Sequence, residues 1–166
     1  MSEKLSAGAE MPKLSVAKLG GGNVDIGGAR DGWQLVVVYR GVHCPLCKRY
    51  LGGLKDIKAD YDAAGIGIVA VSADSEEQAR AFNDELELNF DIGYGLSKAQ
   101  MQALGVYISD PRSEQETDHQ FPEPGLFVVN PEGKVQIVDI SNAPFSRPDL
   151  GSILNGIKFI KDKGYP

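Results

Sequence analysis

Apolar positions in the first half of the chain follow two different periods. Residues 34–39, QLVVVY, form a largely apolar, β-branched run after Asp31-Gly32, which is typical of a strand buried on both faces. Further along, apolar side chains recur at helical spacing between charged residues; they are Tyr50, Leu54, Ile57 and Tyr61. The pattern predicts a buried central strand that leads directly into an amphipathic helix.

The pattern then alternates between strands and helices. Residues 66–71 predict a second buried strand, and the capping-box signature that begins at Ser75 predicts the start of a helix. A shorter strand is expected at 90–94. A short helix is expected at 97–104, closed by Gly105. This alternation is typical of an α/β protein.

The last third of the chain begins with a polar segment. Residues 109–124 carry charge, three prolines and almost no apolar side chain, which predicts a loop. Two apolar runs joined by Asn130-Pro131-Glu132-Gly133 predict a β-hairpin over 126–138, and Pro148 is expected to open a last helix. Without an internal repeat or a second compositional block, residues 1–166 are expected to form a single domain.

The net charge of the chain excludes some classes of binding protein. The 166 residues hold 17 Lys and Arg against 23 Asp and Glu, a formal net charge of −6, which argues against binding to nucleic acid or to an anionic membrane. The N-terminal segment has no apolar stretch suited to a signal peptide, and no later run has the length of a membrane span. We therefore expect a cytoplasmic protein, in a compartment that keeps thiols reduced.

Both cysteines lie in the stretch YRGVHCPLCKRY, residues 39–50. A static disulfide between Cys44 and Cys47 would stabilise the fold by only about 2 kcal/mol, because the loop it closes is short. A zinc site would need two more ligands, and the histidines are His43, beside the pair, and His119, in the polar loop. The remaining interpretation is a dithiol that cycles between reduced and oxidised forms.

The position of the pair between a strand and a helix favours redox chemistry. Cys44 would be the N-cap of the helix and Pro45 its first residue, where the missing N–H costs nothing. The Cys44 sulfur could accept from the free N–H groups of Leu46 and Cys47 at the positive end of the helix. We therefore expect the pKa of Cys44, and not that of Cys47, to lie below that of a free thiol.

Some neighbouring residues leave two interpretations open. Arg40 and Lys48 could add positive charge beside Cys44 or point into solvent. His43 could relay a proton or only shape the rim of the site. Within the helix, Gly52-Gly53 indicates a bend or a close backbone contact.

These residues carry a resemblance to a known family. The run LVVVYRGVHCPLCKRYL, residues 35–51, resembles the active-site strand, turn and helix of the thioredoxin superfamily. Its aromatic-Arg-Gly before Cys-Pro-x-Cys is similar to a peroxiredoxin-like branch of the alkyl hydroperoxide reductase and thiol-specific antioxidant (AhpC/TSA, redoxin) family. The segments KLGGGNVDI, GIGIVAVSADS, PGLFVVNPEGKV and FSRPDLGSIL resemble that family's N-terminal hairpin, next strand, late hairpin and entry to the C-terminal helix. The resemblance implies a thioredoxin-like α/β fold: a mixed central sheet flanked by helices, with an N-terminal β-hairpin extension.

Two positions depart from the pattern of typical peroxiredoxins. Gly41 stands where that family places a threonine or serine, three residues before the peroxide-attacking cysteine, and Pro124 stands where it places an arginine. A peroxide needs hydrogen-bond donors as its O–O bond breaks, so both losses argue against fast peroxidase chemistry. Pro124 resembles instead the cis-proline of thioredoxins, which lies against the sulfurs. We therefore expect a cis bond there.

These features predict a thiol-disulfide oxidoreductase with an antioxidant role, in which Cys44 is the nucleophile and Cys47 resolves the mixed disulfide. The residues expected to bind substrate or tune the thiolate are Arg40, Gly41, His43, Pro45 and Pro124. Two alternatives stay open. One is a peroxiredoxin-like peroxidase, in which Cys47 condenses with a sulfenic acid on Cys44. The other is a non-catalytic redox sensor or binding module that uses the pair as a switch.

The predicted chemistry also indicates partners. A disulfide or a peroxide would be the substrate, and a thiol system such as thioredoxin or glutathione would supply the electrons. No metal or organic cofactor is expected. The sequence leaves the oligomeric state open.

Overall fold

The computed structural model describes residues 3–164, which form a seven-stranded sheet in the order β2-β1-β5-β4-β3-β8-β9. Its strands are β1 (Leu14–Lys18), β2 (Asn23–Ile26), β3 (Trp33–Val38), β4 (Ile66–Val71), β5 (Asp91–Tyr94), β8 (Gly125–Val129) and β9 (Val135–Ile140). β3, β4 and β5 run parallel, whereas β1 pairs with β5 and β8 pairs with β3 in antiparallel fashion. The sheet is therefore mixed. Two short strands, β6 (Ile108–Ser109) and β7 (Phe121–Pro122), pair with each other.

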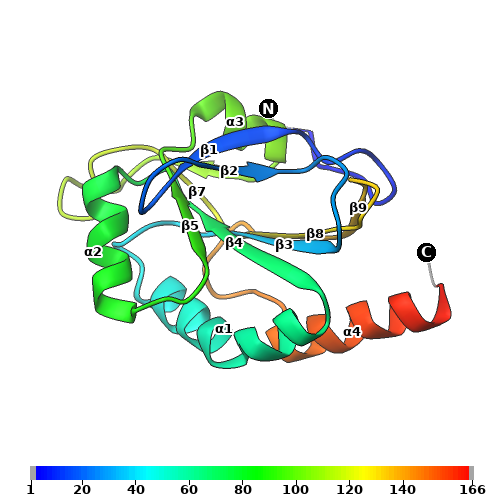
Figure 1. Ribbon diagram of the computed structural model, residues 1–166. Helices are drawn as coiled ribbons and strands as arrows, with labels where there is room; N and C mark the ends of the chain where they lie inside the picture. Colours follow the sequence, from blue (N-terminus) through cyan, green and yellow to red (C-terminus); the bar gives the residue numbers. More distant parts are fainter. Residues whose placement is uncertain (1–2, 165–166) are drawn as a thin grey trace.

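Helices cover both faces of the sheet (Figure 1). They are α1 (Pro45–Ala63), α2 (Glu76–Leu86), α3 (Lys98–Leu104) and α4 (Leu150–Lys163). α1 and α4 lie together on one face, and their buried side chains share a core cluster with Leu35 and Val37 of β3. α3 lies on the other face, where its buried side chains cluster with Val36 and Val38. β3 is thus buried on both faces, as the sequence predicts.

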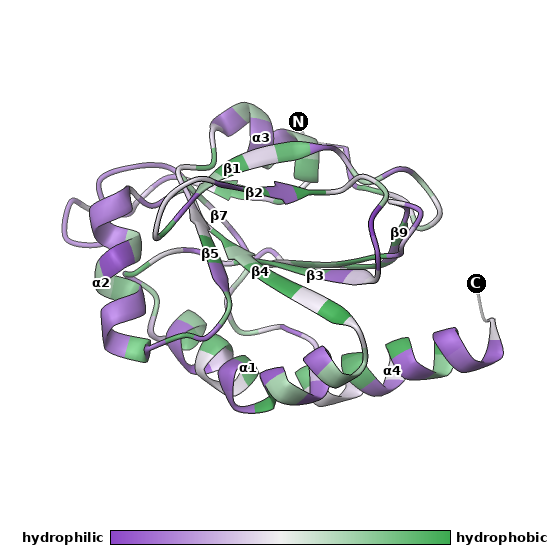
Figure 2. Cartoon of the chain, in the orientation of Figure 1, coloured by the Kyte–Doolittle hydropathy of each residue, from purple (hydrophilic) through white to green (hydrophobic). Residues whose placement is uncertain are grey.

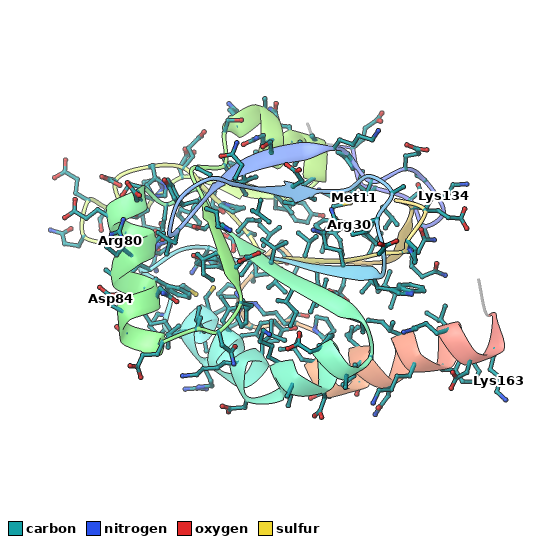
Figure 3. All side chains as sticks on the ribbon, in the orientation of Figure 1. Met11, Arg30, Arg80, Asp84, Lys134 and Lys163 are labelled. Atoms are coloured by element: carbon teal, nitrogen blue, oxygen red, sulfur yellow. The ribbon has the colours of Figure 1, made fainter. Side chains whose placement is uncertain are left out.

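Hydropathy follows this layering (Figure 2). β3 and β4 are largely hydrophobic, because helices cover both of their faces. α2 is two-sided: Ala79 and Phe82 are buried, whereas Figure 3 shows Arg80 and Asp84 on its outer side. Within residues 3–164, no helix combines the length and the apolar composition needed to cross a membrane.

Most of the expected elements are present. The strands expected at 34–39 and 66–71 are β3 and β4, and the hairpin expected at 126–138 is β8–β9. α2 begins after Ser75 with both hydrogen bonds of a capping box. These elements are well predicted because their signals lie within a few residues of sequence.

The predicted start of the last helix is wrong. α4 begins at Leu150 rather than at Pro148, because Asp149 is its N-cap. The Asp149 carboxylate accepts the Ser152 N–H at 2.8 Å, which satisfies one of the free donors of the first turn. Pro148 therefore lies just outside the helix.

The expected cis bond before Pro124 is also wrong, since every peptide bond within residues 3–164 is trans. Pro124 is buried and joins β7 to β8. The Glu123 N–H donates to the Tyr107 carbonyl at 2.7 Å, and the Ser141 N–H donates to the Pro124 carbonyl at 3.0 Å. These bonds are made with the trans isomer, which X–Pro bonds prefer by about 0.5–1 kcal/mol.

Candidate active site

The two cysteines lie where β3 leads into α1. Cys44 is the N-cap, in extended conformation, and Pro45 is the first residue of the helix. The Cys47 N–H donates to the Cys44 Sγ at 3.3 Å. Both are free thiols, and Cys44 is only 1% exposed. The expected N-cap geometry is therefore present, but in a buried setting.

The two sulfurs differ in their tendency to ionise. A hydrogen bond from the Cys47 thiol lowers the pKa of Cys44 against the effect of burial, and the Arg40 guanidinium and the Cys47 backbone N–H lower it further. Burial raises the pKa of Cys47, and the hydrogen bond to Cys44 raises it again. The reduced pair therefore favours a thiolate on Cys44 and a proton on Cys47.

Arg40 is held beside Cys44 by two acidic residues. Its Nε donates to Glu123 Oε1 at 2.9 Å, and its side chain is only 16% exposed. The other Glu123 oxygen accepts from Ser109 Oγ at 2.6 Å, and Glu116 lies 3.9 Å from Arg40 Nη2. The charge of the same guanidinium acts on Cys44 and helps to lower the pKa of its thiol. Arg40 therefore does not point into solvent, and its charge acts on Cys44 instead.

Gly41 makes room for a buried carboxylate. Its φ is +141°, and an added Cβ would lie 2.5 Å from Asp74 Oδ1. The other Asp74 oxygen accepts the Val42 N–H at 2.8 Å. The position where typical peroxiredoxins carry a hydroxyl is thus a glycine for a steric reason, because any side chain would collide with Asp74.

His43 packs against the wall of the site. Its ring meets the Phe121 ring at 63°, with the centroids 4.6 Å apart. Burial and the nearby Arg40 charge lower the pKa of His43 to about 4, so the imidazole is neutral at pH 7. Among the described residues, neither ring nitrogen has a hydrogen-bond partner. No proton relay through His43 is therefore visible in this arrangement.

The other candidate residues lie at the periphery. Pro45 is exposed at the start of α1, and Lys48 pairs with Glu85 of α2 at 3.0 Å rather than with a sulfur. Pro124 and Arg147 both line one small pocket. Within the part of the chain that the structure describes, no group of three or more His, Cys, Asp or Glu side chains is arranged to hold a metal ion.

A second arginine reaches the second sulfur. Arg147, in the segment between β9 and α4, places Nη2 2.7 Å from Cys47 Sγ and donates through Nη1 to the Leu46 carbonyl at 3.4 Å. Its guanidinium also lies over the Tyr50 ring, 5.0 Å from the centroid. Each cysteine thus has its own arginine.

Sequence reasoning missed the roles of four residues, namely Asp74, Glu123, Arg147 and His119. His119 is anchored rather than solvated, since its Nε2 lies 3.3 Å from Asp74 Oδ1 and 3.1 Å from Gln78 Oε1. The only sequence signals were indirect: Asp74 ends a buried strand, Glu123 precedes Pro124, and Arg147 precedes the last helix. Such positions are compatible with many roles until the fold brings their partners together.

Comparison with known proteins identifies the family. Residues 7–138 match the family model of AhpC/TSA. The chain belongs to the AhpC/TSA family. Membership confirms the resemblance seen in the sequence and the prediction of an oxidoreductase that acts on disulfides or peroxides.

Individual relatives agree with this assignment. A Mycobacterium tuberculosis protein (strain H37Rv), provisionally named a peroxiredoxin, is 24% identical over 134 residues, which cover 81% of this chain and 84% of that protein. A peroxiredoxin-like protein from Aquifex aeolicus superposes with a TM-score of 0.79 at 20% identity, covering 94% of this chain and 88% of that one. The reduced 2-Cys peroxiredoxin of Plasmodium vivax gives 0.78 at 16% identity, covering 96% and 84%. These structures confirm the thioredoxin-like fold.

Proposed function

We propose that the enzyme works through a Cys44–Cys47 dithiol cycle and that its preferred oxidant is a small hydroperoxide. The observation that carries this proposal is the buried helix N-cap position of Cys44, whose pKa the positive charge of Arg40 helps to lower. Cys44 is only 1% exposed, so a small oxidant can reach its sulfur more readily than an extended protein disulfide can. Arg40 also supplies the positive donor that Pro124 cannot.

In the first step, the Cys44 thiolate attacks the terminal oxygen of the hydroperoxide and the O–O bond breaks. Cys44 becomes a sulfenic acid, and the alkoxide or hydroxide that leaves takes a proton from water. In the second step, the Cys47 sulfur attacks the Cys44 sulfur, the S–O bond breaks and water leaves. A thiol donor, such as thioredoxin or glutathione, then reduces the disulfide. Arg40 acts in the first step by stabilising negative charge on the reacting oxygens.

A thiol-disulfide oxidoreductase remains the second candidate, and the environment of Gly41 favours it. No hydroxyl is available there, and the Val42 N–H is already bonded to Asp74. Two donors that a peroxide could use near Cys44 are therefore absent or occupied, whereas disulfide exchange needs only a thiolate, a good leaving group and access.

The deciding experiment compares oxidants on one thiolate. Stopped-flow mixing of the reduced protein with hydrogen peroxide, an organic hydroperoxide and a small disulfide measures the loss of the Cys44 thiolate. We expect the hydroperoxides to react faster than the disulfide. Cys44→Ser should abolish the reaction, whereas Cys47→Ser should leave the first step intact and stop at the sulfenic acid. Faster reaction with the disulfide would favour the second candidate, and slow reaction with all three would favour a redox sensor.

Substitution of Arg40 tests the proposed peroxide site directly. Arg40→Met should slow the reaction with hydroperoxide by about 10²-fold, the size expected for losing one charged donor to the reacting oxygen. Arg49→Met is the matched control, since Arg49 is an exposed arginine of α1 with no hydrogen bond or ion pair among the described contacts. Equal rates in the two variants would contradict the role of Arg40.

A further inference from the structure

The two arginines face sulfurs in different states. In the reduced pair, the Cys47 backbone N–H donates to the Cys44 sulfur at 3.3 Å, and the lowered pKa of Cys44 favours the negative charge on this sulfur rather than on Cys47. Arg147 lies beside the neutral sulfur, with Nη2 2.7 Å from Cys47 Sγ. Because a cation stabilises a thiolate far more than a thiol, most of the effect of Arg147 is unused while Cys44 holds the charge.

We propose that Arg147 is a catalytic residue of the second step, which stabilises the Cys47 thiolate after Cys44 has been oxidised. The inference rests on the proposed dithiol cycle, but it applies equally to a hydroperoxide or a disulfide as oxidant. Either oxidant converts Cys44 to an uncharged sulfur. The Cys47 proton then loses its acceptor, and the nearest cation to Cys47 is Arg147.

The step balances for both oxidants. With a sulfenic acid, the Cys44–Cys47 S–S bond forms, the S–O bond breaks, and the proton of Cys47 ends on the leaving hydroxide as water. With a mixed disulfide, the old S–S bond breaks, and the proton ends on the leaving thiolate. In each case Cys47 must release its proton while it is buried, and Arg147 is placed to offset that cost.

The surroundings of Arg147 hold it in position and leave its charge available. It donates to the Leu46 carbonyl and lies over Tyr50, whose hydroxyl donates to the neighbouring Pro148 carbonyl at 2.6 Å. Arg40 has Glu123 as an ionic partner. Within residues 3–164, by contrast, no carboxylate forms a salt bridge with Arg147. Arg147 is therefore not held in a direct ion pair, and the acids that line the same spaces as its side chain are Asp139 and Asp149.

Among the described residues, the main titratable groups that act on Cys47 can be named. They are Cys44, Arg147, Arg40 and Tyr39. Burial raises the pKa of Tyr39, so this phenol stays neutral. Arg40 is directed to Cys44 and Glu123. Loss of Arg147 therefore removes the cation that contacts the Cys47 sulfur.

The test separates the two chemical steps. In Arg147→Met, the oxidation of Cys44 should stay within about twofold of wild type, whereas disulfide closure should slow about tenfold or more, as expected for losing a hydrogen bond to a charged group. The sulfenic acid, trapped with dimedone and measured by mass spectrometry, should accumulate. The rate of disulfide closure should reach its half-maximal value at a higher pH than in wild type. Arg147→Lys should recover part of the rate, and Arg49→Met should behave like wild type.

A second measurement needs no turnover. In a Cys44→Ser background, the rate of Cys47 alkylation by iodoacetamide against pH reports the ionisation of Cys47, which should move to higher pH when Arg147 is replaced by Met. Circular dichroism checks folding, and Arg147→Gln replaces the Met variant if that variant is unfolded. An unchanged closure rate and an unchanged alkylation profile would overturn the inference. If the wild type forms no Cys44–Cys47 disulfide with any oxidant, the dithiol cycle fails instead, and the alkylation profile still decides the effect of Arg147.

Discussion

His43 is adjacent to the thiolate in sequence, yet its surroundings keep it uncharged. Its ring packs on the edge of Phe121, and the Arg40 guanidinium lies over the same Phe121 ring. Burial disfavours the imidazolium first, and repulsion from Arg40 adds to this effect, which together lower its pKa to about 4. At the residue scale, the site therefore keeps its positive charge on arginines, which cannot lose it near neutral pH.

The lowered pKa of His43 predicts a dependence of stability on pH. In the unfolded chain His43 binds a proton near pH 6.5, but in the folded chain only near pH 4. The unfolded state therefore holds more protons between these values, so the free energy of unfolding should fall as the pH drops from about 6.5 to 4. Urea unfolding across this pH range should show a smaller decrease in the free energy of unfolding for His43→Phe than for wild type. An NMR titration of His43 with a midpoint near 6.5 would contradict this.

At the scale of secondary-structure elements, glycines have opposite roles on the two sides of Cys44. Gly41, in the turn between β3 and α1, has a left-handed φ and is tightly enclosed by Asp74. Gly52 and Gly53 lie inside α1, and an added Cβ at either position would meet nothing within 4 Å. Of the bend and the close backbone contact that the Gly52-Gly53 pair indicated, the close contact is therefore wrong, because an added Cβ at either residue would face open space.

Alanine substitutions should have opposite effects at these positions. Gly41→Ala should destabilise the protein by about 1–3 kcal/mol, because the alanine side chain would adopt a strained backbone conformation and collide with Asp74. Gly52→Ala should stabilise it by about 0.5–1 kcal/mol, because alanine loses less entropy in a helix and no clash arises. Urea denaturation measures both changes. A loss of stability in Gly52→Ala would show that the space beside α1 is needed.

At the scale of the whole molecule, the two core clusters lie on opposite faces of the same central strands, and β3 contributes to both. Leu35 and Val37 belong to the cluster under α1 and α4, whereas Val36 and Val38 belong to the cluster under α3. β3 also pairs on its two edges with β4 and β8. Loss of either helical layer would therefore expose β3, which couples the two halves of the core.

This coupling supports the prediction that residues 1–166 form a single cooperative domain. Thermal or urea unfolding should give one transition, with the same midpoint from far-UV circular dichroism and from tryptophan fluorescence. The fluorescence reports on Trp33, which begins β3 and packs against the cluster under α1. Two separated midpoints would show that the α3 face unfolds independently.

The sequence alone determined what depends on near neighbours. The apolar run before Cys44 predicted β3, and Pro45 with its downstream periodicity predicted α1 and the Cys44 N-cap. These features could be predicted because strand burial, helix capping and the field of a helix end act over a few residues. The same local information was too weak for the isomer at Pro124 and for the start of α4 after Pro148.

Tertiary structure decided which charges meet the cysteines. Arg40 bonds to Glu123 across 83 positions of sequence, Arg147 reaches Cys47 across 100, and Asp74 accepts the Val42 N–H across 32. Asp74 and Glu123 stand near several other charged residues, and Arg147 stands far from the cysteines in sequence, so spacing alone does not show which charge each site meets. The selection is made by the order of β4, β3 and β8 in the sheet and by the packing of α4 on α1, which bring distant segments to the same N-cap. Long-range pairing of this kind depends on chain topology, which local residue preferences do not encode.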